Sequence, residues 1–279
     1  LRARQAQGTL VLRIEYLDGP RVVPGSTEQL IYELAWLGLT WDEGPDRGGP
    51  CGPYLQSQRS ELYEAALRTL ADKGLVYSCT CTRKEIAQIG SAPHGELGPV
   101  YPGTCRNGET HPGRPAALRF RMPAQLERFV DVLHGEYVRD VRDDFVLRRS
   151  DGLYAYQLAV VVDDLAMRIS EVVRGDDLLS STPRQLALYR ALGEQPPTFL
   201  HVPLVLDASG QRLSKRTGST SVSELRARGV SSERVLGWLG HSLGLCEDAP
   251  ISLGELGARF SVSQLSKIPT RISVDPLQA

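Results

Sequence analysis

Apolar residues recur at helical spacing in two segments of the first third of the chain. In residues 26–38 they follow Ser26, a residue type that starts helices, and precede Gly38, a residue type that ends them. In residues 61–73 the same spacing precedes Gly74. The pattern predicts a helix in each segment, with the glycine as its C-terminal stop.

A third amphipathic helix is predicted at residues 181–193. Ser181 offers a capping hydroxyl, and Pro183 suits the first turn because its nitrogen needs no hydrogen-bond partner there. Gly193 suits the end of the helix. The tail from residue 222 onward is also predicted to be helical, and residues 235–239 are its most apolar part.

Short runs with the composition or alternation of strands lie between these helices, at residues 9–14, 75–77, 117–122, 145–148, 169–174 and 202–206. Because strands and helices alternate, we predict an α/β fold with a doubly wound, Rossmann-type core. Residues 78–150 are rich in Pro- and Gly-containing loops, which indicates an inserted, mostly β subdomain. We therefore expect four parts. The two halves of the core are residues 1–77 and 151–221, the insertion is residues 78–150, and a helical C-terminal region is residues 222–279.

The composition indicates a soluble globular protein. Of the 279 residues, 41% are hydrophobic, which is enough for one large core or two moderate ones. The formal net charge is -1, so a nucleic-acid partner would have to meet a local basic face. No apolar run approaches the roughly 20 residues that span a bilayer, and no secretory signal pattern is seen, so we expect a cytoplasmic protein with no membrane partner.

Lysine is rare in this chain, which makes Lys215 conspicuous. Of 32 Lys and Arg residues, lysine supplies only four, at positions 73, 84, 215 and 267. Lys215 lies in the segment Arg212-Leu213-Ser214-Lys215-Arg216, after an apolar run. A flexible ammonium group is suited to follow the charge that develops on a leaving pyrophosphate, so the segment is typical of a nucleotide-handling loop. The alternative is a solvated basic turn.

Three cysteines in the predicted insertion have a spacing that suits a metal ion. Cys79, Cys81 and Cys105 supply three thiols, and five cysteines without an export signal argue against a disulfide framework. A tetrahedral zinc needs a fourth ligand, for which the candidates are Tyr101, His94 and His111. Such a closed site would be structural. The alternative is three unrelated buried thiols, as we interpret the other two cysteines, Cys51 and Cys246.

Several charged or polar residues lie at the ends of predicted strands, where α/β folds bind ligands. Glu15 suits an ammonium or hydroxyl group, or is an ordinary surface acid at a strand end. Arg174, one element after Tyr156, offers a bidentate fork for a substrate carboxylate, or forms a salt bridge with Asp176 or Asp177. The adjacent carboxylates Asp163-Asp164 either help to hold the site or cap a turn.

Taken together, five segments resemble the glutamyl branch of the class I aminoacyl-tRNA synthetases, and they occur in the order of that family. They are residues 12–18 (LRIEYLD), 56–59 (QSQR), 155–164 (AYQLAVVVDD), 173–177 (VRGDD) and 212–216 (RLSKR). Each is modest alone, but the set is specific and spans nearly the whole chain. The shortened members without an anticodon-binding domain are more similar, because about 60 residues follow Arg216 and the cysteine cluster has the Cys-x-Cys and Tyr-x-x-x-Cys form of their zinc site.

The resemblance implies that glutamate is activated with ATP, aided by Mg²⁺, and then transferred to the queuosine base at the wobble position of tRNA(Asp). It implies that glutamate is held by Glu15, Tyr156 and Arg174. It implies that ATP is bound by the signature loop Arg212, Leu213, Ser214, Lys215 and Arg216, with Lys215 and Ser214 as catalytic residues. One structural zinc is implied at Cys79, Cys81, Tyr101 and Cys105, and we expect a monomer.

Two departures from the family pattern affect these expectations. The first signature, a His-x-Gly-His-like segment, would lie upstream of Leu1, and Tyr16 stands where the family usually has an acid. We therefore expect an N-terminally incomplete chain that is impaired in adenylation. The alternatives are a discriminative glutamyl-tRNA synthetase, which needs a further helical domain, and a non-catalytic module that binds tRNA or glutamate.

Overall fold

The computed structural model of the chain describes residues 1–17, 23–89, 101–212, 221–272 and 277. Its helices are α1 Arg2–Gln5, α2 Ser26–Trp36, α3 Ser60–Asp72, α4 Arg83–Ile89, α5 Tyr156–Ala166, α6 Thr182–Leu192, α7 Val222–Ala227, α8 Ser232–Ser242 and α9 Leu253–Arg259. Its strands are β1 Val76–Cys79, β2 Ala117–Phe120, β3 Leu126–Asp131, β4 Gly135–Asp140, β5 Val146–Arg148, β6 Glu171–Gly175, β7 Thr198–Val202, β8 Val205–Asp207 and β9 Thr270–Ile272. Among these described residues, no helix combines the length and the apolar character that a membrane span requires.

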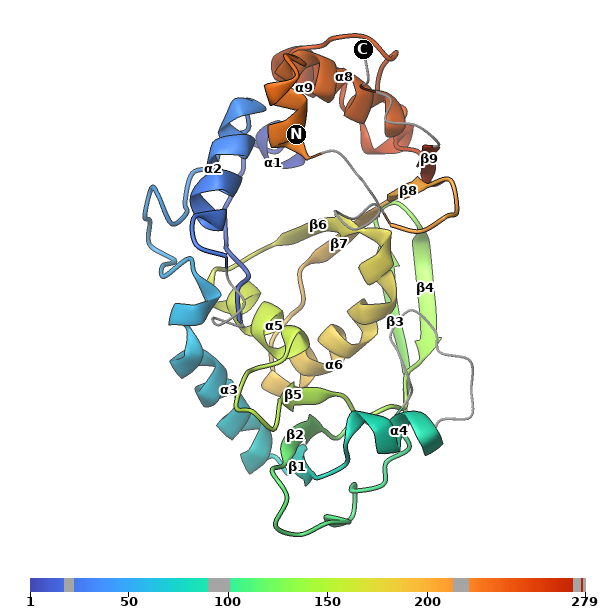
Figure 1. Cartoon of the computed structure of the whole chain (residues 1–279). Coiled ribbons are helices and arrows are strands. Elements are labelled where there is room, and N and C mark those ends of the chain that lie inside the picture. Colours follow the sequence, from blue (N-terminus) through green and yellow to red (C-terminus); the bar gives the residue numbers. More distant parts are fainter. Residues whose placement is uncertain (18–22, 90–100, 213–220, 273–276, 278–279) are drawn as a thin grey trace.

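The strands form three sheets. The central sheet has the order β4-β3-β7-β6, in which β6, β7 and β3 are parallel and β3 and β4 form an antiparallel hairpin. A second, antiparallel sheet has the order β1-β2-β5, and β8 pairs with β9 in parallel. Figure 1 shows the antiparallel sheet at one end of the molecule, helices α8 and α9 at the other, and β6 and β7 between them. The mixed α/β content is therefore confirmed.

The predicted insertion, residues 78–150, contributes to more than one of these sheets. Strands β2 and β5 complete the antiparallel sheet, whereas β3 joins the central sheet by pairing Asp131 with Phe199 of β7. The hairpin thus pairs with β7, although the paired residues Asp131 and Phe199 are almost seventy positions apart in the sequence. The division of the chain into four parts stays a prediction.

The main hydrophobic core lies where α3, α5 and α6 pack on the strands. Leu70 of α3, Leu158 of α5 and Leu188 of α6 are completely buried, together with Leu147 of β5. Every residue of helix α5 from Leu158 to Asp164 is buried, which is typical of a helix enclosed by other elements. The core therefore fixes α5 firmly, and α5 carries several of the candidate site residues.

The helices predicted from local signals are confirmed. Helices α2, α3 and α6 end before Gly38, Gly74 and Gly193, and each glycine has a positive φ that other residues rarely adopt. The capping prediction was wrong, because the Ser181 side chain makes no capping hydrogen bond to α6, although Pro183 lies in its first turn.

The strand predictions hold less well. Residues 9–14 form two isolated parallel bridges, at Val11 and Ile14, and not a regular strand. The run 202–206 is divided between β7 and β8. The β3–β4 hairpin was not predicted at all. Pairing partners decide these cases, and they lie far away in the sequence.

Two helical glycines give a matched test of packing in the C-terminal region. A Cβ on Gly237 of α8 would lie 1.9 Å from the Ala249 carbonyl oxygen, whereas a Cβ on Gly254 of α9 would lie 4.0 Å from its nearest neighbour. We expect Gly237→Ala to lower the free energy of unfolding by about 1–3 kcal/mol or more, because backbone must move. We expect Gly254→Ala to hold or raise it, since alanine favours helices. Urea denaturation checks this, and equal effects would contradict it.

Candidate functional site

The structure brings the three candidate ligand residues Glu15, Tyr156 and Arg174 into one neighbourhood. Glu15 directly follows the bridge that Ile14 makes with Leu55, Tyr156 is the first residue of α5, and Arg174 lies near the end of β6. Burial raises the pKa of the Tyr156 phenol, while the charge of Arg174 lowers it and that of Glu15 raises it. The phenol is therefore close enough to both charged groups to be affected by them.

Arg174 is held by neutral partners only. Its Nε donates to Nε2 of His201 at 3.0 Å, and its Nη2 donates to Thr182 Oγ1 at 2.7 Å and to Gln185 Oε1 at 2.8 Å. The guanidinium also lies 5.3 Å from the ring centroid of Phe199. Within the described residues, no carboxylate lies at ion-pair distance from Arg174. Burial lowers its pKa, so this half-buried cation is the natural partner of an acidic ligand.

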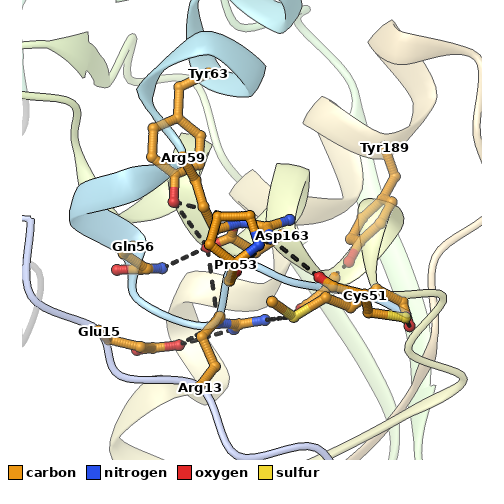
Figure 2. A network of polar contacts seen from close by, with 11 residues as sticks. Arg13, Glu15, Cys51, Pro53, Gln56, Arg59, Tyr63, Asp163 and Tyr189 are labelled. Carbon is orange, nitrogen blue, oxygen red and sulfur yellow. Dashed lines mark hydrogen bonds and ion pairs between the residues drawn. The ribbon is translucent and has the colours of Figure 1, made fainter. Parts of the chain in front are cut away.

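Glu15 presents a fixed carboxylate. Its Oε1 accepts hydrogen bonds from Nη2 and Nε of Arg13, at 2.8 and 3.3 Å. In the part of the chain that the structure describes, its Oε2 accepts none, and 40% of the side chain is exposed. One oxygen thus orients the group and the other is available to a ligand (Figure 2).

Arg13 is itself oriented by α5. Its Nη1 donates to Oδ1 of Asp164 at 2.8 Å, and its Nε lies 3.7 Å from Oδ2 of Asp163. Burial alone would lower the pKa of Arg13, but the carboxylates of Asp164 and Glu15 raise it above its ordinary value. Burial also raises the pKa of Asp164, which Arg13 opposes. Arg13 therefore connects the exposed Glu15 to the buried end of α5.

Asp163 is the centre of a second, fully buried set of contacts. It accepts hydrogen bonds from Arg59 Nε at 2.5 Å, from Gln56 Nε2 at 2.8 Å and from the Tyr63 hydroxyl at 2.9 Å. The side chains of Asp163 and Arg59 are 0% and 1% exposed. Figure 2 shows these donors converging on Asp163 from α3 and the turn before it. Of the two alternatives for Asp163-Asp164, the structure therefore supports a role in holding the site.

The three cysteines of the insertion lie close together. Their Sγ atoms are all within 4.8 Å of one another, and those of Cys81 and Cys105 are 3.5 Å apart. The Tyr101 hydroxyl lies 3.3 Å from Sγ of Cys79 and 4.0 Å from Sγ of Cys81. Zn–S bonds of about 2.3 Å in a tetrahedron separate sulfurs by about 3.8 Å. The three thiols and the phenol therefore fit one tetrahedral metal ion.

The electrostatics of this cysteine cluster also favour a cation. Burial and the neighbouring thiols raise the pKa of Cys81 to about 11. Burial acts against ionisation of Cys105 too, but hydrogen bonds from Thr110 and Thr80 lower its pKa to about 5. The neighbouring thiols therefore oppose the ionisation of Cys81 but not that of Cys105, and a bound cation would favour the thiolate form of both.

The other sulfur and imidazole candidates that the structure describes are not part of the cluster. His111 Nε2 lies 3.6 Å from Glu85, and His94 lies outside the described residues. Cys51 contacts the Met167 carbonyl oxygen and Cys246 that of Gly237, and neither belongs to the group of thiols that could share a metal ion. Tyr101 is thus the fourth ligand that the described geometry supports.

Only the beginning of the predicted signature loop is described. Arg212 is exposed and pairs with Asp177, one of the carboxylates considered as an alternative partner of Arg174. Arg212 also bridges to Leu206 of β8. The remaining loop residues lie outside the described residues: Leu213, Ser214, Lys215 and Arg216. The structure therefore leaves the predicted ATP and catalytic roles of the loop as predictions.

Two site residues were missed in the sequence. His201 of β7 and Asp131 of β3 lie directly behind Arg174, and both are buried. A single histidine in an apolar strand was the available signal for His201. Asp131 gave none, because its contact with His201 joins residues that are 70 positions apart in the sequence.

Comparisons with known proteins agree on one family. Residues 1–246 match the family described as tRNA synthetases class I (E and Q), catalytic domain. A glutamyl-Q tRNA(Asp) synthetase from Nitratidesulfovibrio vulgaris is 51% identical over 99% of this chain and 88% of its own length. A second protein of that name, from Symbiobacterium thermophilum, is 45% identical over 100% of this chain and 90% of its own length.

A solved structure has the same fold over nearly all of this chain. It is a glutamate tRNA ligase from Elizabethkingia meningosepticum in complex with its amino acid, with a TM-score of 0.81 and 27% identity. The match covers 98% of this chain, and the chain spans 62% of the length of that ligase.

The buried ion pair of Asp163 gives a test of what holds the site together. Asp163→Asn leaves the Arg59 guanidinium without its counter-charge, so we expect the free energy of unfolding to fall by about 3–5 kcal/mol. Adding Arg59→Met should recover part of this loss, because the unpaired charge is then removed. Urea denaturation measures both. Asp140→Asn, at an exposed pair with Arg142, is the matched control and should have little effect. A small effect at Asp163 would contradict the assignment.

Proposed function

The chain belongs to the family of class I tRNA synthetase catalytic domains for glutamate and glutamine, and from this premise we propose that it activates glutamate with ATP and transfers it to the queuosine base of tRNA(Asp). The first half of this reaction is that of an amino-acid-activating ligase. The second half, transfer of glutamate to queuosine, is inferred from the name of the two relatives that are 45% and 51% identical to this chain. These relatives also confirm the resemblance that the five sequence segments predict.

The observation that carries the proposal is the pairing of an unneutralised cation with a free carboxylate oxygen. Arg174, with neutral partners only, suits the side-chain carboxylate of glutamate. Glu15, held by Arg13 through one oxygen, suits the α-ammonium group. Tyr156 lies within the field of both and supports a third contact. A glutamate so held leaves its α-carboxylate for the phosphate of ATP.

The chemistry of activation asks little of the protein beyond alignment and charge neutralisation. The α-carboxylate oxygen attacks the α-phosphorus of ATP, and pyrophosphate leaves. We assign contacts with the phosphates to Lys215, within the loop of Arg212, Leu213, Ser214 and Arg216, because an ammonium group on a flexible stem follows the leaving charge. Mg²⁺ would share that neutralisation.

We further assign a zinc ion to the cysteine cluster, with Cys79, Cys81, Tyr101 and Cys105 as its four ligands. Zinc would supply a structural crosslink and no chemistry, because all four positions are filled by the protein. The crosslink ties the end of β1 to the loop that carries Tyr101. The doubly wound core, the monomeric state and the cytoplasmic location belong to the same proposal.

Transfer of glutamate to tRNA tests the proposed function directly. We expect the full-length protein to attach radiolabelled glutamate to tRNA(Asp) that contains queuosine and not to the same tRNA with guanine at that position. Incorporation into tRNA(Glu) would instead identify a glutamyl-tRNA synthetase. No incorporation into any of the three, with glutamate still bound, would identify a non-catalytic module and refute the proposal.

Metal analysis tests the zinc assignment. We expect about one zinc per purified chain, and we expect Cys81→Ser to lower both the zinc content and the melting temperature, because one of four ligands is lost. Cys246→Ser removes a thiol that donates to the Gly237 carbonyl oxygen and packs on the C-terminal hydrophobic cluster, so it should keep the zinc. Equal zinc content in the wild type and the Cys81 variant would overturn the assignment.

A further inference from the structure

Behind Arg174, two buried side chains continue the line of hydrogen bonds away from the proposed ligand. Nε of Arg174 donates to Nε2 of His201 at 3.0 Å, and Nδ1 of His201 lies 2.7 Å from Oδ2 of Asp131. His201 and Asp131 are 0% and 1% exposed. The three residues lie on the neighbouring strands β6, β7 and β3.

These contacts determine the tautomer of His201. An arginine Nε–H is always a donor, so the Nε2 atom of His201 must accept and cannot carry a hydrogen. The hydrogen of a neutral imidazole then lies on Nδ1, which faces the Asp131 carboxylate. The Thr182 hydroxyl, whose Oγ1 lies 3.2 Å from Nε2, can donate to the same atom and is compatible with this arrangement. Burial lowers the pKa of His201, which also favours the neutral ring.

Asp131 is in turn held firmly. Its Oδ2 accepts from the backbone N–H of His201 at 3.1 Å as well as from the ring. Its Oδ1 accepts from the backbone N–H groups of Leu133 and His134, at 3.0 and 2.9 Å. Both carboxylate oxygens of Asp131 thus act as hydrogen-bond acceptors. An asparagine in its place would point its NH₂ group at an N–H group that is itself a donor.

We propose that His201 and Asp131 are positioning residues that orient Arg174 toward the side-chain carboxylate of the amino-acid substrate. The inference rests on the proposed function, because it takes Arg174 as the group that binds this carboxylate. The neutral ring fixes the direction of the guanidinium without neutralising its charge. An acid in place of His201 would hold Arg174 equally well but would compete with the substrate.

The proposal also gives the inserted hairpin a role in the site. Asp131 is the last residue of β3, where β3 pairs with Phe199 of β7. The carboxylate that sets the tautomer of His201 therefore comes from the predicted insertion, and the residues that it orients come from the second half of the core.

Two substitutions of His201 separate the positioning role from a merely structural one. His201→Gln places a side-chain oxygen near the position of Nε2, so it keeps an acceptor for Arg174 and loses the donor to Asp131. His201→Asn places its amide near the position of Nδ1, so it keeps the donor to Asp131 and loses the acceptor for Arg174. We expect the Kd for glutamate, measured by calorimetry, to rise about 10-fold or more in His201→Asn and less than about 3-fold in His201→Gln.

The opposite order, or an equal change in both variants, would overturn the proposal. Leu70→Ala, in the core of α3, is the control for lost stability, and it should lower the melting temperature without changing glutamate affinity. Arg174→Ala separates this inference from the function on which it rests. Unchanged glutamate binding in Arg174→Ala refutes the proposed site. If glutamate binds weakly to Arg174→Ala but with wild-type affinity to both His201 variants, only the positioning role is refuted.

The tautomer itself has a spectroscopic readout that does not depend on activity. In a long-range ¹H–¹⁵N correlation spectrum of the protein with labelled histidine, we expect His201 to be neutral with its hydrogen on Nδ1. Its signals are assigned by their loss in His201→Gln, since the chain has only five histidines. A hydrogen on Nε2, or a doubly protonated ring, would contradict the proposal. Asp131→Asn should convert His201 to the Nε2–H tautomer and weaken glutamate binding.

Discussion

The burial of two adjacent carboxylates on α5 is the constraint on which the site depends. A buried carboxylate is tolerated only where donors or cations surround it, and Asp163 obtains them from Arg59, Gln56 and Tyr63. Asp164 obtains Arg13, and Arg13 then holds Glu15. Segments about 100 to 150 positions apart in the sequence are joined in this way. The geometry of Glu15 is therefore a consequence of the need to satisfy charges inside the protein.

The opposite side of the site follows a different rule. Arg174 is oriented by neutral groups, among them His201. The carboxylate of Asp131 contacts His201 and not Arg174 itself. The charge of Arg174 is thus available to a ligand, whereas the charge of Arg13 is neutralised by ion pairs with Asp164 and Glu15. One free carboxylate oxygen near one unneutralised guanidinium is an arrangement complementary to an amino acid with an acidic side chain. Membership of the class I synthetase family for glutamate and glutamine gives this complementarity its chemical context.

Local signals in the sequence were sufficient for the helices, and they allowed candidate site residues to be named. Glycines at positions 38, 74 and 193 end helices because of their own backbone freedom, and Glu15, Tyr156 and Arg174 could be named from their positions after predicted strands and by resemblance. The partners of Arg13 and Arg174 could not be predicted, because Asp164 and His201 contact them only after the chain has folded. The β3–β4 hairpin was not predicted for the same reason, because its position beside β7 depends on the pairing of Asp131 with the distant Phe199. The signature loop stays a sequence-based prediction.

The most direct test of the proposed glutamate site is an experimental structure with a non-hydrolysable analogue of glutamyl-adenylate bound. We expect the side-chain carboxylate of the glutamyl group within about 3 Å of the Arg174 guanidinium and its ammonium group at Oε2 of Glu15. A ligand bound elsewhere, or one with its side-chain carboxylate away from Arg174, would contradict the central claim.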